Sequence, residues 1–395
     1  MTTDPKIARV ENANDHRPKP AARGTSLGEE FDPRSNALNA WRLTLAMGVI
    51  LWHSWPVAGR QVSFAPAHQL LRDAWVDGFF AVSGFLITWS WFRHPRVRDY
   101  FLARGLRILP GLWICLIITA VVMAPISVAI QGGSAVKLLF SRATVEYVFE
   151  NSAILLLKQD IGGTPSGVPV PGIWDGPVWT LSWEVLCYIA IAGLGLAGLL
   201  RRRWFIPTAL AMAVLWSLLL PPWGVFADVI EAQRRIEDPA TAALLVQAIA
   251  ARFLVMFLAG ALLYKFRNAI PARWSLVALS VVIVLAASFL PNYRMVAAVP
   301  LAYAIIVSGA LIHNKRLRLR TDLSYGVYIY AWPVQQFLVI CGLRILNPFV
   351  FALVSAAGTL PLAALSWFLV EKPAIALKSR LMRRSIGSAG NRQPG

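Results

Sequence analysis

Cysteine and charged residues are both scarce in this 395-residue chain. The three cysteines, Cys115, Cys187 and Cys341, all lie in apolar runs, which excludes a disulfide framework and gives no metal-binding spacing. Charged residues make up 15% of the chain and hydrophobic residues 57%, whereas soluble domains have about 25% and 45–50%. A water-soluble fold of this length cannot bury so much apolar surface, but a lipid bilayer solvates it. The composition therefore predicts an integral membrane protein.

Acidic residues are also few: 20 Asp and Glu stand against 38 Lys and Arg, a net charge of +18. Such a charge is typical of nucleic-acid binders, but here the basic residues fall in short clusters between apolar runs. Clusters of this kind fit the positive-inside rule and contact with anionic lipid, so we expect no nucleic-acid partner. No GxSxG elbow, P-loop, HExxH or dinucleotide fingerprint occurs in a fitting context. We therefore predict no metal and no tightly bound cofactor.

From Leu38 onward, apolar runs of roughly 17–23 residues recur, the length that one helix needs to cross hydrocarbon. They predict an all-α integral membrane protein with about ten transmembrane helices. The predicted spans are 38–56, 74–92, 108–130, 178–200, 204–221, 244–264, 273–290, 294–312, 322–342 and 348–370.

The ends of the chain are polar. Residues 1–37 predict a disordered tail without a signal peptide, and residues 374–395 a second, basic tail, leaving 38–373 as the membrane domain. With both tails in the cytoplasm, about three quarters of the Lys and Arg residues fall on the inner side, as the positive-inside rule requires. We therefore predict a multi-pass protein of the inner membrane. Two long outer loops, 131–177 and 222–243, are expected to be functional or disordered.

The first span contains two ionisable residues, Arg42 and His53, and such residues inside a membrane are functional hypotheses by default. Eleven residues of helix make three turns plus about 20°, so both side chains share one face, roughly 16 Å apart along the axis. Arg42 would lie at the cytoplasmic mouth, either as a lipid anchor or as a ligand contact. His53 would lie deeper, either as a packed histidine or as a general base.

Two further groups lie around the second span. Gly78, Ser83 and Gly84 are small residues that permit close helix approach, and Asp77 either caps the helix or serves a site. The inner loop that follows carries arginines at positions i and i+3, which form one basic patch on a helix. These residues, Arg104 and Arg107, are either ordinary positive-inside charges or a clamp for phosphates.

The fourth and ninth spans carry the remaining candidates. Trp179 and Trp183 open the fourth span as interfacial or site residues, and Glu184 lies several residues deeper, where it needs a partner that a histidine could supply. Tyr325 and Tyr328 in the ninth span are more typical of packing with a hydrogen-bonded hydroxyl than of catalysis.

Together these residues resemble the acyltransferase-3 family, the membrane O-acyltransferases of bacterial surface polysaccharides and their relatives. The resemblance runs from Leu38 to Pro373 and includes six motifs in order. The late family motif often ends in His-x-Pro, but here that histidine is replaced by Ala331. The matching motifs are Arg-X10-His at Arg42 and His53, FFxxSGFLI within Asp77–Ile87, RxxR at Arg104 and Arg107, WTLxxE at Trp179–Glu184, SYxxY at Ser324–Tyr328, and ExP at Glu371–Pro373.

The resemblance implies an enzyme that binds acyl-CoA, and more specifically acetyl-CoA, from the cytoplasm. The acceptor would be a hydroxyl of an envelope glycan or glycolipid. His53 would be catalytic, either alone or together with a Glu184 that is hydrogen-bonded to it, and Arg42, Arg104 and Arg107 would bind the donor. The oxyanion donor is not identified, and transfer is either direct or through a covalent intermediate on a residue such as Ser182. The supporting residues would be Asp77, Ser83, Trp179, Ser182, Ser324, Tyr325 and Tyr328.

Two other functions fit a polytopic protein. In a secondary transporter or exporter of a sugar or lipid-linked intermediate, the intramembrane charges would form a coupling path. Transporters commonly show repeated halves, but this chain shows no such internal symmetry and its polar residues gather in the first half. A non-catalytic scaffold would have no need of His53 and Glu184 in the bilayer.

Overall fold

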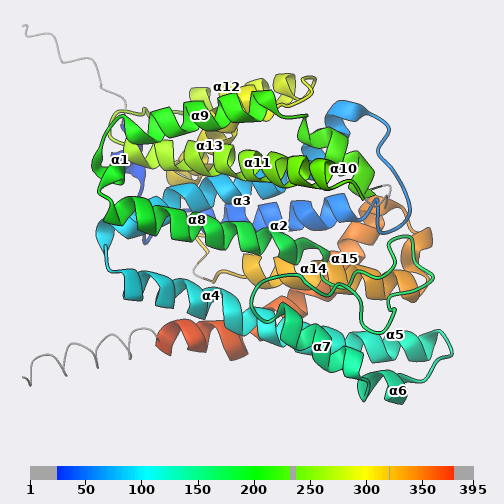
Figure 1. The fold of residues 1–395 in the computed structure, drawn as a ribbon. Helices are drawn as coiled ribbons and strands as arrows, with labels where there is room; N and C mark the ends of the chain where they lie inside the picture. Colours follow the sequence, from blue (N-terminus) through cyan, green and yellow to red (C-terminus); the bar gives the residue numbers. More distant parts are fainter. Residues whose placement is uncertain (1–24, 232–236, 320, 378–395) are drawn as a thin grey trace, which may run out of the picture.

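The computed structural model describes residues 25–231, 237–319 and 321–377. Within these ranges the chain forms helices joined by turns and loops, and no named β-strand is found there. The long helices lie side by side along one common direction (Figure 1). The predicted all-α architecture is confirmed for this part of the chain.

A long helix lies at each apolar run in which the sequence predicts a span. Asp238 caps α11 and Asn347 caps α15, each followed by a proline, which fits the first helical turn. The helices are α2 (Leu38–His53), α3 (Ala65–Arg93), α4 (Val97–Ile118), α8 (Trp179–Leu196), α9 (Phe205–Leu219), α11 (Pro239–Lys265), α12 (Trp274–Ala287), α13 (Arg294–Leu311), α14 (Ser324–Ile340) and α15 (Pro348–Ser366).

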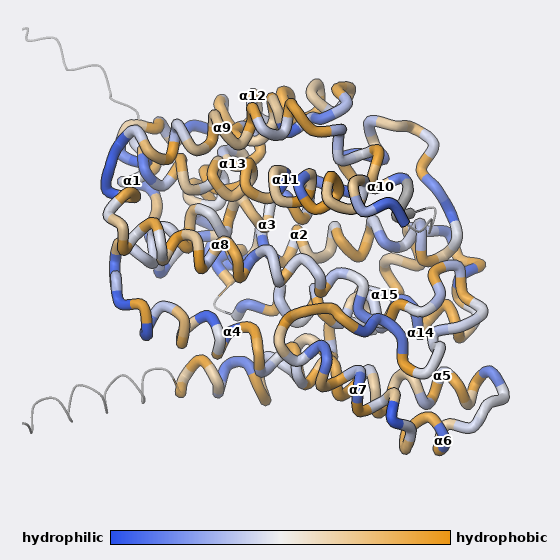
Figure 2. Tube along the Cα trace, viewed as in Figure 1, coloured by the Kyte–Doolittle hydropathy of each residue, from blue (hydrophilic) through white to orange (hydrophobic). Residues whose placement is uncertain are grey.

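Two of these helices, α4 and α15, continue into a π-helical turn. The π-helical turn Thr119–Met123 joins α4 to α5 (Ala124–Ile130), and a second π-helical turn, Trp367–Glu371, extends α15. Five stretches of the described chain are long and apolar enough to cross a membrane, and α9 and α12 are shorter apolar helices. Figure 2 shows hydrophobic residues along the helices, with many hydrophilic residues near their ends. The five stretches are Val97–Ile130, Gly176–Leu196, Pro239–Lys265, Arg294–Leu311 and Pro348–Leu377.

These findings support a membrane protein, while the ten-span topology and the cytoplasmic position of the termini remain predictions. The two ends of the described chain, the first beside α1 (Leu27–Glu30) and the second after the red helix that continues from α15, lie at the same end of the helix bundle (Figure 1). That arrangement is the one an even number of spans produces.

The segment 25–37 differs from the predicted disordered tail. It contains α1 (Leu27–Glu30), which begins with a capping box between Ser26 and Glu29. The Leu27 amide donates to the Ile270 carbonyl at 2.8 Å, and the Leu27 side chain is fully buried. The physical reason is that an apolar anchor in the polar tail packs onto the helix bundle. Residues 1–24 lie outside the described part of the chain.

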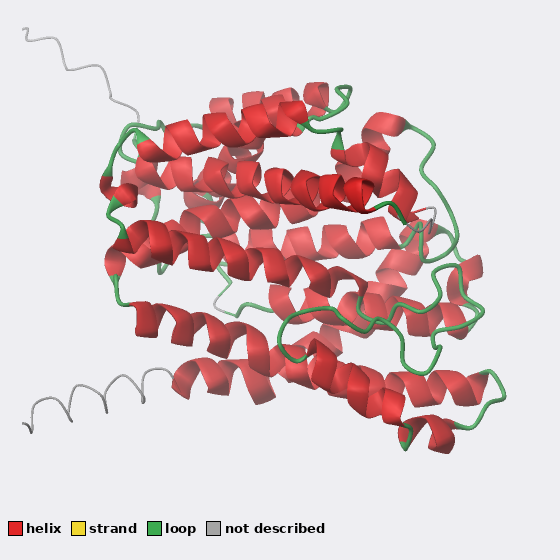
Figure 3. Cartoon of the chain, in the orientation of Figure 1, coloured by secondary structure: helices red, strands yellow, loops and turns green. Residues whose placement is uncertain are grey.

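The predicted outer loops also contain helices. Residues 131–177 include α6 (Ala135–Leu139) and α7 (Arg142–Asn151), and residues 222–243 include α10 (Trp223–Glu231). Figure 3 shows a long loop between α7 and α8. This loop ends at the buried Asp175, whose carboxylate accepts a hydrogen bond from the Tyr147 hydroxyl. Burial raises the pKa of Asp175 to about 7, so near neutral pH its side chain is partly uncharged, which lowers the cost of burying it.

Glycines bring α3 and α11 into close contact. A Cβ atom on Gly84 would lie 1.9 Å from the Phe257 carbonyl oxygen, and one on Gly260 would lie 1.8 Å from the Ala81 carbonyl oxygen. Both distances are far shorter than a van der Waals contact, and the obstacles are backbone atoms. The predicted role of Gly84 in close helix approach is therefore confirmed.

Gly84→Ala is expected to destabilise the protein by about 1–3 kcal/mol, because the two helices must separate to admit the methyl group. The thermal unfolding temperature in detergent measures this effect. Gly193→Ala is the matched control, since a Cβ at that helical position meets nothing within 4 Å, and it should leave stability unchanged or slightly higher. An equal effect of both substitutions would contradict the close contact.

Candidate active site

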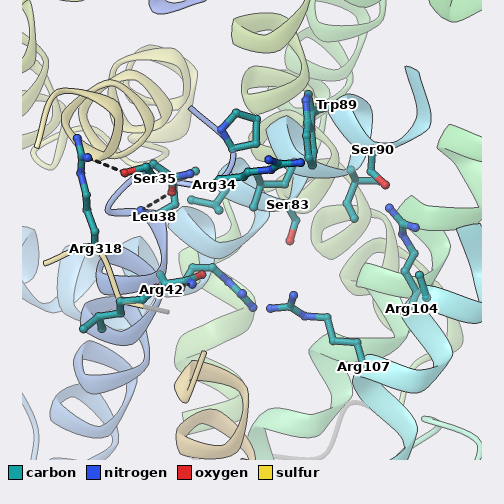
Figure 4. Close-up of a pocket in the computed structure, with 18 of the residues that line it drawn as sticks. Arg34, Ser35, Leu38, Arg42, Ser83, Trp89, Ser90, Arg104, Arg107 and Arg318 are labelled. Atoms are coloured by element: carbon teal, nitrogen blue, oxygen red, sulfur yellow. Dashed lines mark hydrogen bonds between the residues drawn. The ribbon is translucent and has the colours of Figure 1, made fainter. Parts of the chain in front are cut away.

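A large basic cavity of about 990 Å³ opens at the end of the bundle where α2 begins and α3 ends. It lies between α2, α3, α4 and α8, and two loop segments, 33–36 and 315–319, complete its wall. Figure 4 shows arginines approaching it from several sides. Its cationic lining residues are Arg34, Arg42, Arg104, Arg107, Lys315 and Arg318.

We call this basic cavity the inner cavity, after the predicted orientation of the chain. Arg42 and Arg107 point toward one another across it (Figure 4). Both guanidinium groups form ion pairs with the carboxylate of Asp322, which also accepts a hydrogen bond from Ser324 Oγ at 2.6 Å. The sequence-based prediction missed Asp322. Asp322 could have been found by the argument used for Glu184, because it too is an acidic residue in a predicted span and therefore requires a partner.

Arg104 is held differently from Arg107. Its guanidinium carbon lies 3.4 Å from the ring centroid of Tyr100, and its Nη1 donates to the Tyr100 carbonyl at 2.8 Å. Arg104 is buried, whereas the Arg107 side chain is 40% exposed. Both arginines line the inner cavity. The Arg104 guanidinium is fixed by stacking on Tyr100, whereas the Arg107 guanidinium is more accessible to a ligand.

Glu184 also lines the inner cavity. Its Oε1 accepts hydrogen bonds from Ser83 Oγ at 2.9 Å and from the Tyr188 hydroxyl at 2.6 Å. The predicted hydrogen bond between Glu184 and His53 is absent, and within the described chain His53 Nδ1 has no hydrogen-bond partner. The prediction failed because the Glu184 carboxylate lines a different cavity from His53 and accepts hydrogen bonds from Ser83 and Tyr188 instead.

His53 lines a second cavity of about 410 Å³, the outer cavity. Its ring packs edge-on against Trp332, with ring centroids 4.7 Å apart. The rest of the wall combines aromatic surfaces with a few charged and polar groups. These other residues include Trp52, Trp179, Trp223, Tyr328, Trp332, Arg72, Asp73, Gln159, Thr180 and Arg252.

A third cavity of about 50 Å³ lies between the other two, and we call it the neck. The neck shares Arg42, Ser83 and Glu184 with the inner cavity and Val76, Thr180 and Tyr328 with the outer cavity. Its other lining residues are Phe79, Phe80, Leu181, Ser324 and Tyr325. The three cavities therefore follow one another along the bundle, with Arg42 at the inner end and His53 at the outer end.

Asp77 belongs to a buried ion-pair network and lines none of the three cavities. Its carboxylate accepts from Arg252 Nε at 2.9 Å and from Arg294 Nε at 2.5 Å, as well as from the Tyr293 hydroxyl. Asp73 pairs with the same two arginines, at 3.3 and 2.9 Å. Because Asp73 and Arg252 line the outer cavity, the network forms one of its walls. Asp77 is thus a structural residue rather than a helix cap.

The remaining predicted residues divide into two groups. Ser182 Oγ donates to the Ile154 carbonyl at 2.6 Å, and Tyr325 donates to the Ile108 carbonyl at 2.7 Å. Ser182 lines none of the three cavities. In contrast, the hydroxyls of Tyr328 and Thr180 lie 2.7 Å apart where the neck meets the outer cavity.

Comparisons with known proteins identify the family of this chain. Residues 35–368 match the model of the acyltransferase-3 family, described as an acyltransferase domain. Nodulation protein 10 of Rhizobium leguminosarum bv. viciae is 26% identical over 91% of this chain and 99% of its own length. The O-acetyl transferase of Shigella phage Sf6 is 29% identical over 86% of this chain and 96% of its own length. No solved structure shows significant similarity. Because the family model covers nearly all of the membrane domain, this chain belongs to the acyltransferase-3 family and is an acyltransferase.

Proposed function

We propose that this protein transfers an acetyl group from acetyl-CoA to a hydroxyl of an envelope glycan or glycolipid, at the inner membrane. The observation that carries the proposal is the neck, which lies between a basic cavity and an aromatic, histidine-containing cavity and shares three lining residues with each. The similarity to an O-acetyl transferase supports an acetyl group and a hydroxyl acceptor.

The inner cavity suits a CoA thioester. Its volume of about 990 Å³ is at the upper end of the roughly 300–1,000 Å³ typical of ligand pockets. Its cationic lining favours a donor that carries several phosphates, and the stacked Arg104 presents a planar fork in a fixed place. The thioester end of the donor would extend toward Glu184 and the neck.

The outer cavity suits a carbohydrate. Tryptophan faces supply large apolar surfaces with a polar edge, on which the C–H faces of a sugar ring can pack. Arg72 and Gln159 line the same cavity and can hydrogen-bond to sugar hydroxyls. A few polar groups among aromatic walls are typical of specific small-molecule sites.

In the proposed reaction, His53 removes the proton of the acceptor hydroxyl as this oxygen attacks the carbonyl carbon of the thioester. The carbon–sulfur bond breaks, and the proton held by His53 passes to the departing CoA sulfur. Developing charge on the carbonyl oxygen requires a donor. The hydroxyls of Tyr328 and Thr180 lie where the neck meets the outer cavity, and either would serve by leaving its hydrogen bond to the Pro177 carbonyl. Because Ser182 is directed to the Ile154 carbonyl, direct transfer is favoured over an acyl-enzyme.

The test is a measurement of CoA release by the purified protein in lipid nanodiscs, with acetyl-CoA and an envelope glycolipid fraction. The proposal expects release that depends on the acceptor, together with a mass increase of the glycolipid by one acetyl group. A transporter or a scaffold would release no CoA. Comparison of the envelope glycolipids of a deletion strain and its parent by mass spectrometry would then identify the natural acceptor.

Replacing both Arg104 and Arg107 by lysine is expected to raise the KM for acetyl-CoA about tenfold or more, because charge-assisted hydrogen bonds to phosphate contribute roughly 1.5–3 kcal/mol each. Lysine keeps the charge but loses the planar fork and the stacking on Tyr100. Arg98→Lys, at an exposed position of the same helix, is the control and should leave KM unchanged. An unaltered KM in the double variant would mean that these arginines only set the membrane orientation and do not bind the donor.

A further inference from the structure

The neck is much smaller than the cavities that it joins. Its volume is about 50 Å³, against about 990 and 410 Å³ for the inner and outer cavities. A cavity of roughly 150 Å³ holds benzene, which has six non-hydrogen atoms, so by proportion the neck has room for about two or three such atoms. An acetyl group has three such atoms and a hexanoyl group has seven. The neck therefore accommodates an acetyl group, whereas a hexanoyl group exceeds its volume.

The middle of the neck is mostly apolar, because the hydroxyls of Ser324 and Tyr325 are bound to Asp322 and to the Ile108 carbonyl. Its apolar walls are held by packing. Phe80 stacks on Phe253 with ring centroids 4.0 Å apart and planes 8° from parallel. Phe79 packs edge-on against Tyr328 at 5.6 Å, and Leu181 is 4% exposed. Closely packed walls of this kind yield little to a larger group, so the volume of the neck is a real limit.

Polar groups stand at both ends of the neck. Arg42, Ser83 and Glu184 lie where it meets the inner cavity, and the hydroxyls of Thr180 and Tyr328 lie where it meets the outer cavity. On the proposed path, an acyl group delivered from the inner cavity enters the neck, where its carbonyl carbon meets the acceptor. A longer chain would either exceed the neck or extend into the outer cavity and occupy the place of the acceptor.

We propose that the neck selects the acyl group: it admits acetyl and excludes chains of six carbons, with Phe79 and Leu181 setting the limit. The inference rests on the proposed function and specifies its donor. Leu181→Ala removes three carbon atoms from the wall, and Phe79→Leu replaces a ring by a smaller group. Both changes enlarge the neck without altering Arg42, Glu184 or His53.

The experiment compares kcat/KM for acetyl-CoA, butyryl-CoA and hexanoyl-CoA, measured as acceptor-dependent CoA release. Each methylene in a tight apolar site changes specificity by roughly 10–200-fold, so the wild-type protein should prefer acetyl-CoA over hexanoyl-CoA by at least about 100-fold. Leu181→Ala and Phe79→Leu should each raise the ratio of hexanoyl to acetyl transfer at least about tenfold. Leu112→Ala and Phe257→Leu are matched controls, because both residues are buried and neither lines any of the three cavities. They should leave the ratio unchanged.

The ratio is taken within one preparation, so a smaller folded fraction affects both donors equally, and either enlarging variant is sufficient if the other does not fold. Equal use of acetyl-CoA and hexanoyl-CoA by the wild-type protein would overturn the inference. So would an unchanged ratio in a folded enlarging variant. If the wild-type protein used no acyl-CoA at all, the proposed function itself would fail, which is a different result.

Discussion

His53→Ala is expected to lower acyl transfer by about 10²–10⁴-fold, because a general base typically contributes that factor. The histidine lines the outer cavity, where the acceptor hydroxyl would lie, and its Nδ1 is buried without a partner in the described chain. Binding of acetyl-CoA, measured by calorimetry with the purified variant, should persist, since the basic residues line a different cavity. Acceptor-dependent CoA release measures the loss.

His94→Ala is the matched control, because His94 is exposed at the end of α3, and it should retain full activity. His53→Gln separates packing from proton transfer: glutamine fills much of the same space but cannot act as a base near neutral pH. If a stably expressed His53→Gln protein turned over at a near-normal rate, His53 would be a packing residue. The proposed reaction would then lack its base.

Asp77→Asn is expected to lower the free energy of unfolding by about 3–5 kcal/mol, since removing one partner of a buried ion pair leaves uncompensated charge. The Asp77 carboxylate is fully buried and binds both Arg252 and Arg294. Asparagine keeps the shape and one acceptor oxygen but not the charge. Thermal unfolding in detergent and the yield of correctly inserted protein measure the effect.

The control is another aspartate–arginine pair in a different environment. The Asp228 side chain is 67% exposed and pairs with Arg72 at 2.9 Å, so Asp228→Asn should change stability by less than about 1 kcal/mol. Combining Asp77→Asn with Arg294→Gln should restore part of the lost stability. The second substitution removes the positive charge that the first leaves without its partner. If Asp77→Asn and Asp228→Asn were equally stable, the Asp77 network would contribute little to stability.

The sequence alone predicted where several candidate residues lie. The rise of a helix placed Arg42 and His53 at different depths of one helix, and they do line the inner and the outer cavity, respectively. Periodicity is reliable here because a helix fixes the rise and rotation of every residue. The basic residues Arg104 and Arg107 likewise line one cavity.

Partner assignments could not be predicted in the same way. Glu184 was expected to bind His53, yet Ser83 and Tyr188 bind it instead. Tyr188 was within reach of a sequence argument, because residues i and i+4 are neighbours on a helix. Ser83 was not, because its contact with Glu184 depends on how α3 packs against α8.

By itself, the sequence determined that this is a helical membrane protein of the acyltransferase-3 family, because apolar runs, charge bias and motif order are properties of the chain. The tertiary structure alone decided which charges meet: Asp322 joins Arg42 to Arg107, and Asp77 joins Arg252 to Arg294. These partners lie between 175 and 280 residues apart. Local spacing carries no information about such pairs, since only the packing of whole helices brings them together and forms the neck between the two cavities.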